Sequence, residues 1–514
     1  MSATLTKIEE GEMPTIAIHP DRKISKIDDL IYSGFTEHMG RCIYGGIYDP
    51  GNPLSDENGF RLDVLDALKE LNVPCMRYPG GNFIATYHWE DAIGPMENRK
   101  ARPELAWLGV EPNTFGTDEF MKWCRKLGAE PYFALNMATG TLTEAMAWVE
   151  YCNGTRDTYY ANLRRKNGHP EPYNVKYWAL GNECWGPWQV EQMTKEVYTA
   201  KAVQWAKALK LLDPSLVLIL CGQDGTASWD YYTLKHACLP ANSPLSSTKS
   251  TLIDMHSIHL YTASTHPVKN ALQPLAAERA IEITSGLIDL ARIENHIPLN
   301  EPRPKICFDE WNVWDPIRAE GSKGGEESYT LSDALAVAVW MNVFIRKSKD
   351  IGMTCIAQSV NVISPLMTTK DGIIKQTTWW PYLLFCKYMR GHAVATHVSS
   401  PFYDGNFETD NLAPTPLGWL GGVKDIPYLD VSAALGDDGY VNAVIVNAHD
   451  TKDFETKVEG VNGNEVQVFT VYADDINACN MHGKQEVGIQ ESTWNGKGTY
   501  TFLKHSVTML RWKA

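Results

Sequence analysis

The sequence predicts an α/β fold, a (β/α)8 TIM barrel with a C-terminal antiparallel β-sandwich domain that the N-terminal strand joins. Between about residues 35 and 391, eight short apolar runs alternate with longer helical patterns, which indicates a parallel sheet. After His392 the pattern becomes β-rich and shows no long helix. We therefore predict a strand within residues 1–30 that pairs with the sandwich, a catalytic barrel over 31–391, and a jelly-roll-like sandwich over 392–514.

The eight strand-like runs each end in polar or glycine residues. They cover residues 35–46, 73–82, 129–137, 175–180, 216–222, 254–261, 305–312 and 354–362. A doubly wound open sheet is the structural alternative, but the first unit carries no glycine-rich phosphate loop.

Helical patterns separate these runs and place apolar side chains on one stripe. Residues 60–71 and 117–128 are two such segments, and the second ends at Gly128, a suitable C-cap. A third pattern over 191–213 stops before Pro214, and a fourth begins at a natural N-cap pair in 332–347. In the predicted sandwich, residues 440–449, 465–473 and 498–512 are the strand-forming segments.

Composition and charge exclude several classes of protein. The 514 residues are 44% hydrophobic and 21% charged, which is typical of a protein with a full core. The formal net charge is -15, so nucleic acid and anionic membranes would be repelled. The longest apolar stretch, residues 334–345, is interrupted by Asn342 and too short to span a bilayer, and it reads as a buried helix.

The cysteines indicate a reducing compartment. There are 11, an odd number, spread singly and without a CxxC pair, and several fall inside apolar runs. We predict no metal, no disulfide and no cofactor, and a cytoplasmic location.

Polar side chains at the ends of the eight runs are the candidates for chemistry, because the carboxyl ends of barrel strands converge on one face. Two acids stand out: Glu183 ends the fourth run and Glu310 ends the seventh. Asp309 precedes Glu310 and should point the opposite way on a strand, so we interpret it as a structural partner in a buried network. The other candidates are Glu37, Arg77, Asn82, Asn136, Asn182, His259, Tyr261 and Gln358.

Two carboxylates facing one cavity are what glycoside hydrolysis requires, one to protonate the leaving oxygen and one to attack or stabilise the anomeric centre. An ion-paired structural role for both acids is the alternative. Trp185, Trp188, Trp311 and Trp314 lie near the two acids and offer faces on which sugars stack, and Trp107 is a further candidate for sugar contact.

The motifs also resemble a known family. GNE after an apolar strand, followed by a strand-terminal Glu, resembles the large clan of (β/α)8 glycosidases. The set EHMGRC, RYPGGNF, GNE with GPWQ, and FDEWNVW is more specific and is similar to the α-L-arabinofuranosidases of glycoside hydrolase family 51.

This resemblance implies a role for each candidate. Glu183 would be the general acid/base and Glu310 the nucleophile of a retaining double displacement. Glu37, Arg77, Asn82, Asn182, Tyr261 and Gln358 would bind the sugar before the scissile bond, and His259 would support the proton network. The implied substrates are terminal α-L-arabinofuranosyl residues on plant cell-wall-derived oligosaccharides, and the resemblance implies a homo-oligomer, either a trimer or a hexamer.

Two alternatives remain open at this point. An endo-acting β-1,4-glucanase or xylanase could use the same barrel, and an open cleft above Glu183 would favour it. A silent carbohydrate-binding protein could keep the aromatic surface without turnover.

Overall fold

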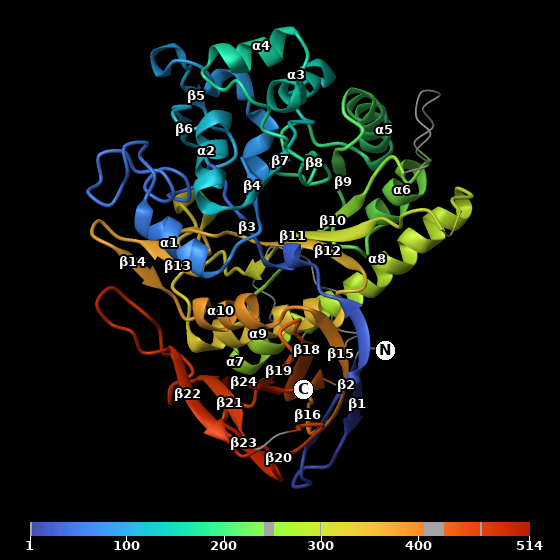
Figure 1. The fold of residues 1–514 in the computed structure, drawn as a ribbon, viewed down its shortest axis with the longest axis vertical. Helices are drawn as coiled ribbons and strands as arrows, with labels where there is room; N and C mark the ends of the chain where they lie inside the picture. The colour runs from blue at the N-terminus through green and yellow to red at the C-terminus, as the bar shows by residue number, and fades with distance from the viewer. Residues whose placement is uncertain (1–2, 241–250, 299, 406–425, 463–464) are drawn as a thin grey trace.

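Eight parallel strands close into a barrel, in the order β10-β11-β12-β3-β4-β7-β8-β9. The structure is a computed structural model that describes residues 3–240, 251–298, 300–405, 426–462 and 465–514. The barrel occupies the upper part of Figure 1, and the C-terminal sheet lies below it with both termini. The predicted fold class is confirmed, and the doubly wound alternative is wrong because the sheet is closed.

Each of the eight predicted runs overlaps one barrel strand, although the first run shares only Phe35 with its strand. The strands are β3 (Ser33–Phe35), β4 (Cys75–Tyr78), β7 (Glu130–Ala134), β8 (Tyr177–Leu180), β9 (Val217–Leu220), β10 (Met255–Thr262), β11 (Lys305–Val313) and β12 (Ile351–Ile356). Their residues are almost wholly buried, which is why these strands read as continuous apolar runs and show no alternation.

Helices surround the barrel and follow the predicted patterns. Gly128 ends α2 in the left-handed conformation, with φ 85°, as predicted for a C-cap. Thr194 caps α5, where its hydroxyl accepts a hydrogen bond from the backbone N–H of Val197. The helices are α1 (Leu62–Glu70), α2 (Thr117–Leu127), α3 (Leu142–Asn153), α4 (Tyr159–Lys166), α5 (Lys195–Leu212), α6 (Ser228–Ala237), α7 (Pro267–Leu272), α8 (Leu275–Glu294), α9 (Leu331–Arg346) and α10 (Trp379–Tyr388).

The remaining strands form a separate, mostly antiparallel sheet. Its order is β22-β21-β24-β19-β18-β15-β2-β20-β23, and β1 pairs with β15. The strands are β1 (Ala3–Lys7), β2 (Thr15–Lys26), β15 (His392–Ser400), β18 (Leu429–Leu435), β19 (Tyr440–Asn447), β20 (Phe454–Glu459), β21 (Val466–Val471), β22 (Ile489–Trp494), β23 (Thr499–Phe502) and β24 (Ser506–Lys513). Side chains from across this sheet meet in a second core, which makes the sheet a sandwich.

The N-terminal strand joins the sandwich as the sequence predicts. β2 pairs antiparallel with β15 and parallel with β20. Three two-stranded ladders complete the described strands: β5 (Arg102–Pro103) with β6 (Val110–Glu111), β13 (Leu366–Thr368) with β14 (Ile373–Lys375), and β16 (Phe402–Tyr403) with β17 (Ile426–Pro427).

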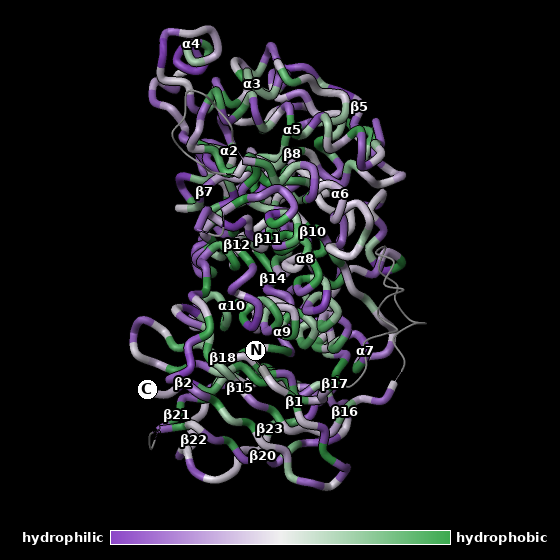
Figure 2. Tube along the Cα trace, turned by 90° about the vertical axis from the view of Figure 1, so that its right-hand side faces the viewer, coloured by the Kyte–Doolittle hydropathy of each residue, from purple (hydrophilic) through white to green (hydrophobic). Residues whose placement is uncertain are grey.

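Helix α9 connects the two cores. Every residue from Leu331 to Arg346 is buried, as predicted for the apolar stretch at 334–345. One side of α9 packs on β11 and the other on β18, β19 and β24. Figure 2 shows this hydrophobic helix between the barrel and the sandwich. Among the described residues, no helix is both long enough and apolar enough to cross a membrane.

Candidate active site

A cavity of about 330 Å³ opens at the carboxyl ends of the barrel strands. Residues in or after seven of the eight barrel strands line it, and among the described residues β7 and the segment after it contribute none. Of the predicted site residues, Glu37, Asn82, Trp107, Glu183, His259, Tyr261, Glu310 and Gln358 line the cavity. Arg77 and Asn182 do not line it. Arg77 donates to Glu310, and Asn182 accepts a hydrogen bond from Arg77.

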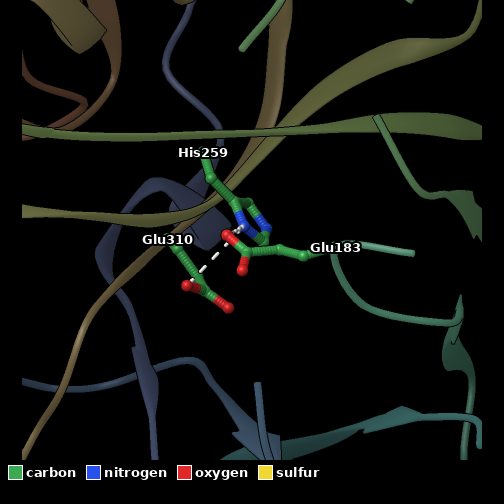
Figure 3. A group of neighbouring side chains, drawn as sticks. All are labelled: Glu183, His259 and Glu310. Atoms are coloured by element: carbon green, nitrogen blue, oxygen red, sulfur yellow. Dashed lines mark hydrogen bonds and ion pairs between the residues drawn. The ribbon is translucent and has the colours of Figure 1, made fainter. Parts of the chain in front are cut away.

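Glu183 and Glu310 face each other across the floor of this cavity. Glu183 follows β8 in the left-handed region, with φ 41°, and Glu310 lies within β11. A carboxylate oxygen of each acid and a ring nitrogen of His259 all lie within 4.8 Å of one another. Figure 3 shows the two carboxyl groups turned toward each other and toward the imidazole ring.

Arg77, at the end of β4, holds Glu310 in place. Its Nη1 donates to Glu310 Oε1 at 2.7 Å and its Nη2 donates to Asn182 Oδ1 at 2.6 Å. The guanidinium is fully buried and lies over the ring of Phe35. A buried cation at this distance stabilises negative charge on Glu310.

Asp309 also turns into the barrel, so the prediction that it points away from Glu310 is wrong. The pairing of β11 shifts register between Phe308 and Trp311, and this irregularity breaks the strict alternation of side chains. Asp309 accepts hydrogen bonds from Tyr132 and Ser257. Its interpretation as a partner in a buried network is correct.

The imidazole of His259 links three carboxylates. Its Nδ1 lies 2.9 Å from Glu183 Oε1, and its Nε2 lies 3.2 Å from Asp309 Oδ1. Burial opposes the charged form, but the negative charges of Glu310 and Asp309 and the bond to Glu183 outweigh it and raise the pKa of His259 to about 10. At neutral pH both ring nitrogens therefore carry protons and donate. For Asp309, Arg77 and His259 outweigh burial and lower the pKa below its usual range.

Tyr261, in β10, supplies a second donor to the nucleophile candidate. Its hydroxyl donates to Glu310 Oε2 at 2.8 Å. Burial and the nearby charge of Glu310 raise the pKa of Tyr261 well above its usual range, so the hydroxyl keeps its proton.

Glu37 forms the opposite wall of the cavity. It accepts hydrogen bonds from Gln358 Nε2 at 2.9 Å and from the Trp107 indole N–H at 3.2 Å. A Cβ at Gly81 would lie 2.7 Å from Glu37 Oε2, so glycine is needed at this close approach. Burial and the negative charge of Glu310 raise the pKa of Glu37 to about 8.

Comparisons with known proteins identify the family. Residues 67–273 match the family described as "Alpha-L-arabinofuranosidase 1 domain", and residues 309–506 match "Alpha-L-arabinofuranosidase C-terminal domain". A relative from Aspergillus terreus, named "Probable alpha-L-arabinofuranosidase C", is 73% identical over 99% of this chain and 100% of its own length. The chain belongs to the α-L-arabinofuranosidase family.

Solved structures refine this assignment. An α-L-arabinofuranosidase from Thermotoga maritima in complex with arabinose has a TM-score of 0.86 and 36% identity, covering 98% of this chain and 100% of that one. A family 51 α-L-arabinofuranosidase from Thermotoga petrophila gives the same TM-score and identity over 97% of this chain and 100% of its own. This member of glycoside hydrolase family 51 is therefore a glycosidase by descent and by fold.

Amide side chains complete the polar end of the arabinofuranosidase site. Asn82 Oδ1 accepts from Gln189 Nε2 at 2.7 Å, and Gln189 also donates to the backbone oxygen of Asn182. Gln189 lines the cavity but is absent from the predicted site residues. The GPWQ motif that contains it was the available signal. Asn136, at the end of the third run, instead bonds Tyr87 and Thr139 and stays outside the cavity.

The aromatic wall differs in part from the prediction. Trp185, Trp188 and Trp314 line the cavity, as expected for sugar-stacking faces. Trp311 does not, because it points to the opposite side of β11 and packs fully buried against Trp340 of α9. The apolar residues Leu105, Val190 and Ile363 also line the cavity, and no sequence motif singled them out.

The acidic cluster of this family member is poorly suited to a metal ion, although Glu183, His259 and Glu310 have the proximity that a site needs. A doubly protonated His259 has no lone pair to offer, because its pKa is raised to about 10. Both oxygens of Glu310 already accept hydrogen bonds, from Arg77 and from Tyr261.

Proposed function

We propose that this protein is a retaining exo-α-L-arabinofuranosidase in which Glu310 is the nucleophile and Glu183 the acid/base. The observation that carries the assignment is the pair of carboxyl groups whose oxygens lie within 4.8 Å of each other at the ends of β8 and β11. Retaining glycosidases hold their two carboxyl groups about 5–5.5 Å apart, whereas inverting enzymes separate them by about 6.5–9.5 Å to admit a water molecule.

The names of similar proteins support the choice of sugar. The Aspergillus terreus relative is named a probable α-L-arabinofuranosidase, and the Thermotoga maritima structure contains arabinose. At 73% identity over nearly the whole chain, a change of sugar is not expected.

In the first step, Glu310 attacks the anomeric carbon while Glu183 gives its proton to the departing oxygen. Arg77 and Tyr261 orient the attacking carboxylate through their bonds to its two oxygens. The bond from the anomeric carbon to the leaving oxygen breaks, and a glycosyl ester forms on Glu310.

In the second step, Glu183 acts as a base. It takes a proton from a water molecule, whose oxygen attacks the anomeric carbon and releases Glu310 as a carboxylate. The cationic ring of His259 stabilises the charged form of Glu183 at this stage, through Nδ1 at 2.9 Å. Glu183 ends the second step protonated, as it was when it donated in the first.

Glu37, Asn82 and Gln358 are placed to bind the sugar hydroxyls. Gln358 and Glu37 are joined by a hydrogen bond, so the amide and the carboxyl group are already oriented side by side on one wall of the cavity. With its pKa raised to about 8, Glu37 is mostly neutral at pH 7 and can donate to a hydroxyl without adding negative charge beside Glu310.

The shape of the site supports exo action. The cavity volume of about 330 Å³ is at the lower end of the range for small-molecule sites, roughly 300–1,000 Å³. Residues in or after seven of the eight barrel strands surround it, whereas an endo-acting glucanase or xylanase needs a cleft that is open at both ends. The silent-binder alternative gains no support either, because both acids and the groups that orient them are in place.

The natural substrates, the compartment and the assembly are further parts of this proposal. Terminal arabinofuranosyl units on plant cell-wall-derived oligosaccharides fit a pocket of this size. All 11 cysteines are free, which suits the reducing cytoplasm. A trimer or hexamer remains a prediction that light scattering of the purified protein will check.

The test is hydrolysis of three aryl glycosides: an α-L-arabinofuranoside, a β-D-xyloside and a β-D-glucoside. We expect rapid cleavage of the first only, and proton NMR of the first product should show retained anomeric configuration. Inversion would overturn the role of Glu310. Cleavage of the xyloside or glucoside alone would overturn the choice of sugar.

Two matched variants separate the roles of the acids. Glu310→Gln should lower kcat more than 10³-fold on every substrate, because no glycosyl ester can form. Glu183→Gln should retain burst release of nitrophenol from an activated aryl glycoside and accumulate the glycosyl-enzyme. If the two variants behave alike on activated and unactivated substrates, the division of labour is wrong.

A further inference from the structure

Trp188 makes a contact with Glu183 that the double displacement does not explain. Its indole N–H donates to Glu183 Oε2 at 3.1 Å, while His259 occupies Oε1 of the same carboxyl group. An indole nitrogen can donate but cannot accept, so this bond is strongest when Oε2 carries negative charge. The side chain of Trp188 is nonetheless 51% exposed and lies on the outer wall of the cavity.

The loop after β8 is built so that this ring can fold back over Glu183. The backbone N–H of Gly186 donates to Glu183 O at 2.7 Å and closes a tight turn. A Cβ at Gly186 would lie 2.6 Å from the ring of Trp188, so glycine is required for the ring to lie there. Trp185 meets this ring edge-on at 5.2 Å and is itself anchored by a bond to Gly222 O.

This geometry conflicts with the first step of the reaction. The proton for the leaving oxygen must come from Glu183, and Oε1 is turned to His259. Oε2 is therefore the oxygen that must face the leaving group, and the indole N–H of Trp188 lies on this same oxygen.

We propose that Trp188 is a positioning residue that gates the acid. Its indole N–H donates to Glu183 Oε2, and the leaving group displaces this N–H when substrate binds. Oε2, protonated from solvent, then passes its proton to the leaving oxygen. After the leaving group departs, the indole N–H returns and supports the carboxylate that activates water. This inference rests on the proposed role of Glu183 as acid/base.

Other groups face Glu183 and also influence its proton. His259 lies on β10 and Glu310 on β11, Asp309 contacts the other ring nitrogen of His259, and Tyr261 donates to Glu310. The thiols of Cys184 and Cys221 lie next to it in the loops after β8 and β9. Replacing Trp188 by Phe leaves all of these groups in place, so a change in pH dependence would report on the indole N–H alone.

The experiment compares pH profiles of kcat/KM for wild type and Trp188→Phe. The substrate is an alkyl α-L-arabinofuranoside, whose leaving group needs protonation. Without the indole donor the carboxylate of Glu183 is less stabilised relative to its acid form. The basic limb of the kcat/KM profile should therefore move to higher pH by about 0.5–1 unit. Trp185→Phe is the matched control, because it removes an indole N–H that is bonded to backbone in the same wall; its basic limb should stay at the wild-type position.

A second variant and a second substrate secure the interpretation. Trp188→Ala should give the same shift of the basic limb and also a higher KM, because it removes the ring that contacts the leaving group. With a 4-nitrophenyl arabinofuranoside, which needs little protonation, Trp188→Phe should change kcat/KM less than with the alkyl glycoside.

The outcomes are separable from those of the proposed function. If the basic limb of Trp188→Phe coincides with that of wild type or moves to lower pH, the gate is refuted while the enzyme assignment stands. If wild type cleaves no arabinofuranoside, the proposed function fails. Because Trp188 is half exposed, both variants should unfold at the wild-type temperature, and thermal unfolding checks this.

Discussion

Replacing Tyr261 by Phe tests how much the hydroxyl of Tyr261 stabilises negative charge on Glu310. The change keeps the ring and removes one hydroxyl, which donates to Glu310 Oε2 at 2.8 Å in a buried setting. A hydrogen bond to a charged group contributes about 1.5–3 kcal/mol, equivalent to roughly 10–150-fold in rate. Because the hydroxyl keeps its proton over the working pH range, the loss should be independent of pH.

The two chemical steps should respond differently to this loss. In the first step Glu310 gives up its charge as it attacks, so a missing donor costs little. In the second step the carboxylate regains its charge as it leaves, so the missing donor slows that step by most of the expected factor. We therefore expect kcat and KM of Tyr261→Phe to fall together, with kcat/KM less affected.

Stopped-flow measurement with a 4-nitrophenyl arabinofuranoside provides the assay. The variant should release a burst of nitrophenol equal to the enzyme concentration and then turn over about 10–150-fold more slowly than wild type. A kcat within twofold of wild type would refute the reasoning. So would a rise in KM without a burst, because this would place the hydroxyl in substrate binding alone.

Two further predictions concern stability. Burial and nearby carboxylates raise the pKa of Glu327 to about 8, against about 4.5 when unfolded, so the stability that its proton provides is lost as pH rises from 4.5 through 8. Between pH 6 and pH 9, the free energy of unfolding measured with urea should fall by about 3 kcal/mol more for wild type than for Glu327→Gln. Equal decreases for the two proteins would contradict this. Arg346 pairs with Asp430 of the sandwich and Glu278 of α8, so Arg346→Met should cost about 3–5 kcal/mol in urea unfolding with kcat at 25 °C retained. An unchanged urea midpoint would show that the ion pairs of Arg346 do not stabilise the contact between the barrel and the sandwich.

Most of the fold could be predicted because each barrel strand is buried on both faces. Such strands read as short apolar runs that end abruptly in glycine or polar residues, and the eight runs gave all eight strands. The closure of the barrel followed from their number and length. The exact strand ends did not, as β3 covers Ser33–Phe35 and shares only Phe35 with the predicted run 35–46. The residues after Phe35 lie in turns, because the backbone pairing of β3 ends at Phe35.

The candidate site could be predicted at positions within a strand or a few residues after one. Tyr261 lies within β10 and Glu183 lies three residues after β8, and both line the cavity. Residues that reach the site from loops were less visible, because their position depends on how a loop folds and not on strand period. Gln189 and Val190 are examples, since they come to the cavity only through the turn that begins at Glu183.

The irregularity in β11 explains what strand alternation could not. In a regular strand only one of Asp309 and Glu310 would face the interior, but the register shift turns both inward. Two adjacent buried carboxylates require compensation, and Arg77 and His259 supply two positive charges. Glu183 lies against the same cluster, with His259 Nδ1 on one of its oxygens and the indole N–H of Trp188 on the other. Both contacts reach the residue that, in the proposed mechanism, donates a proton in one step and accepts one in the next.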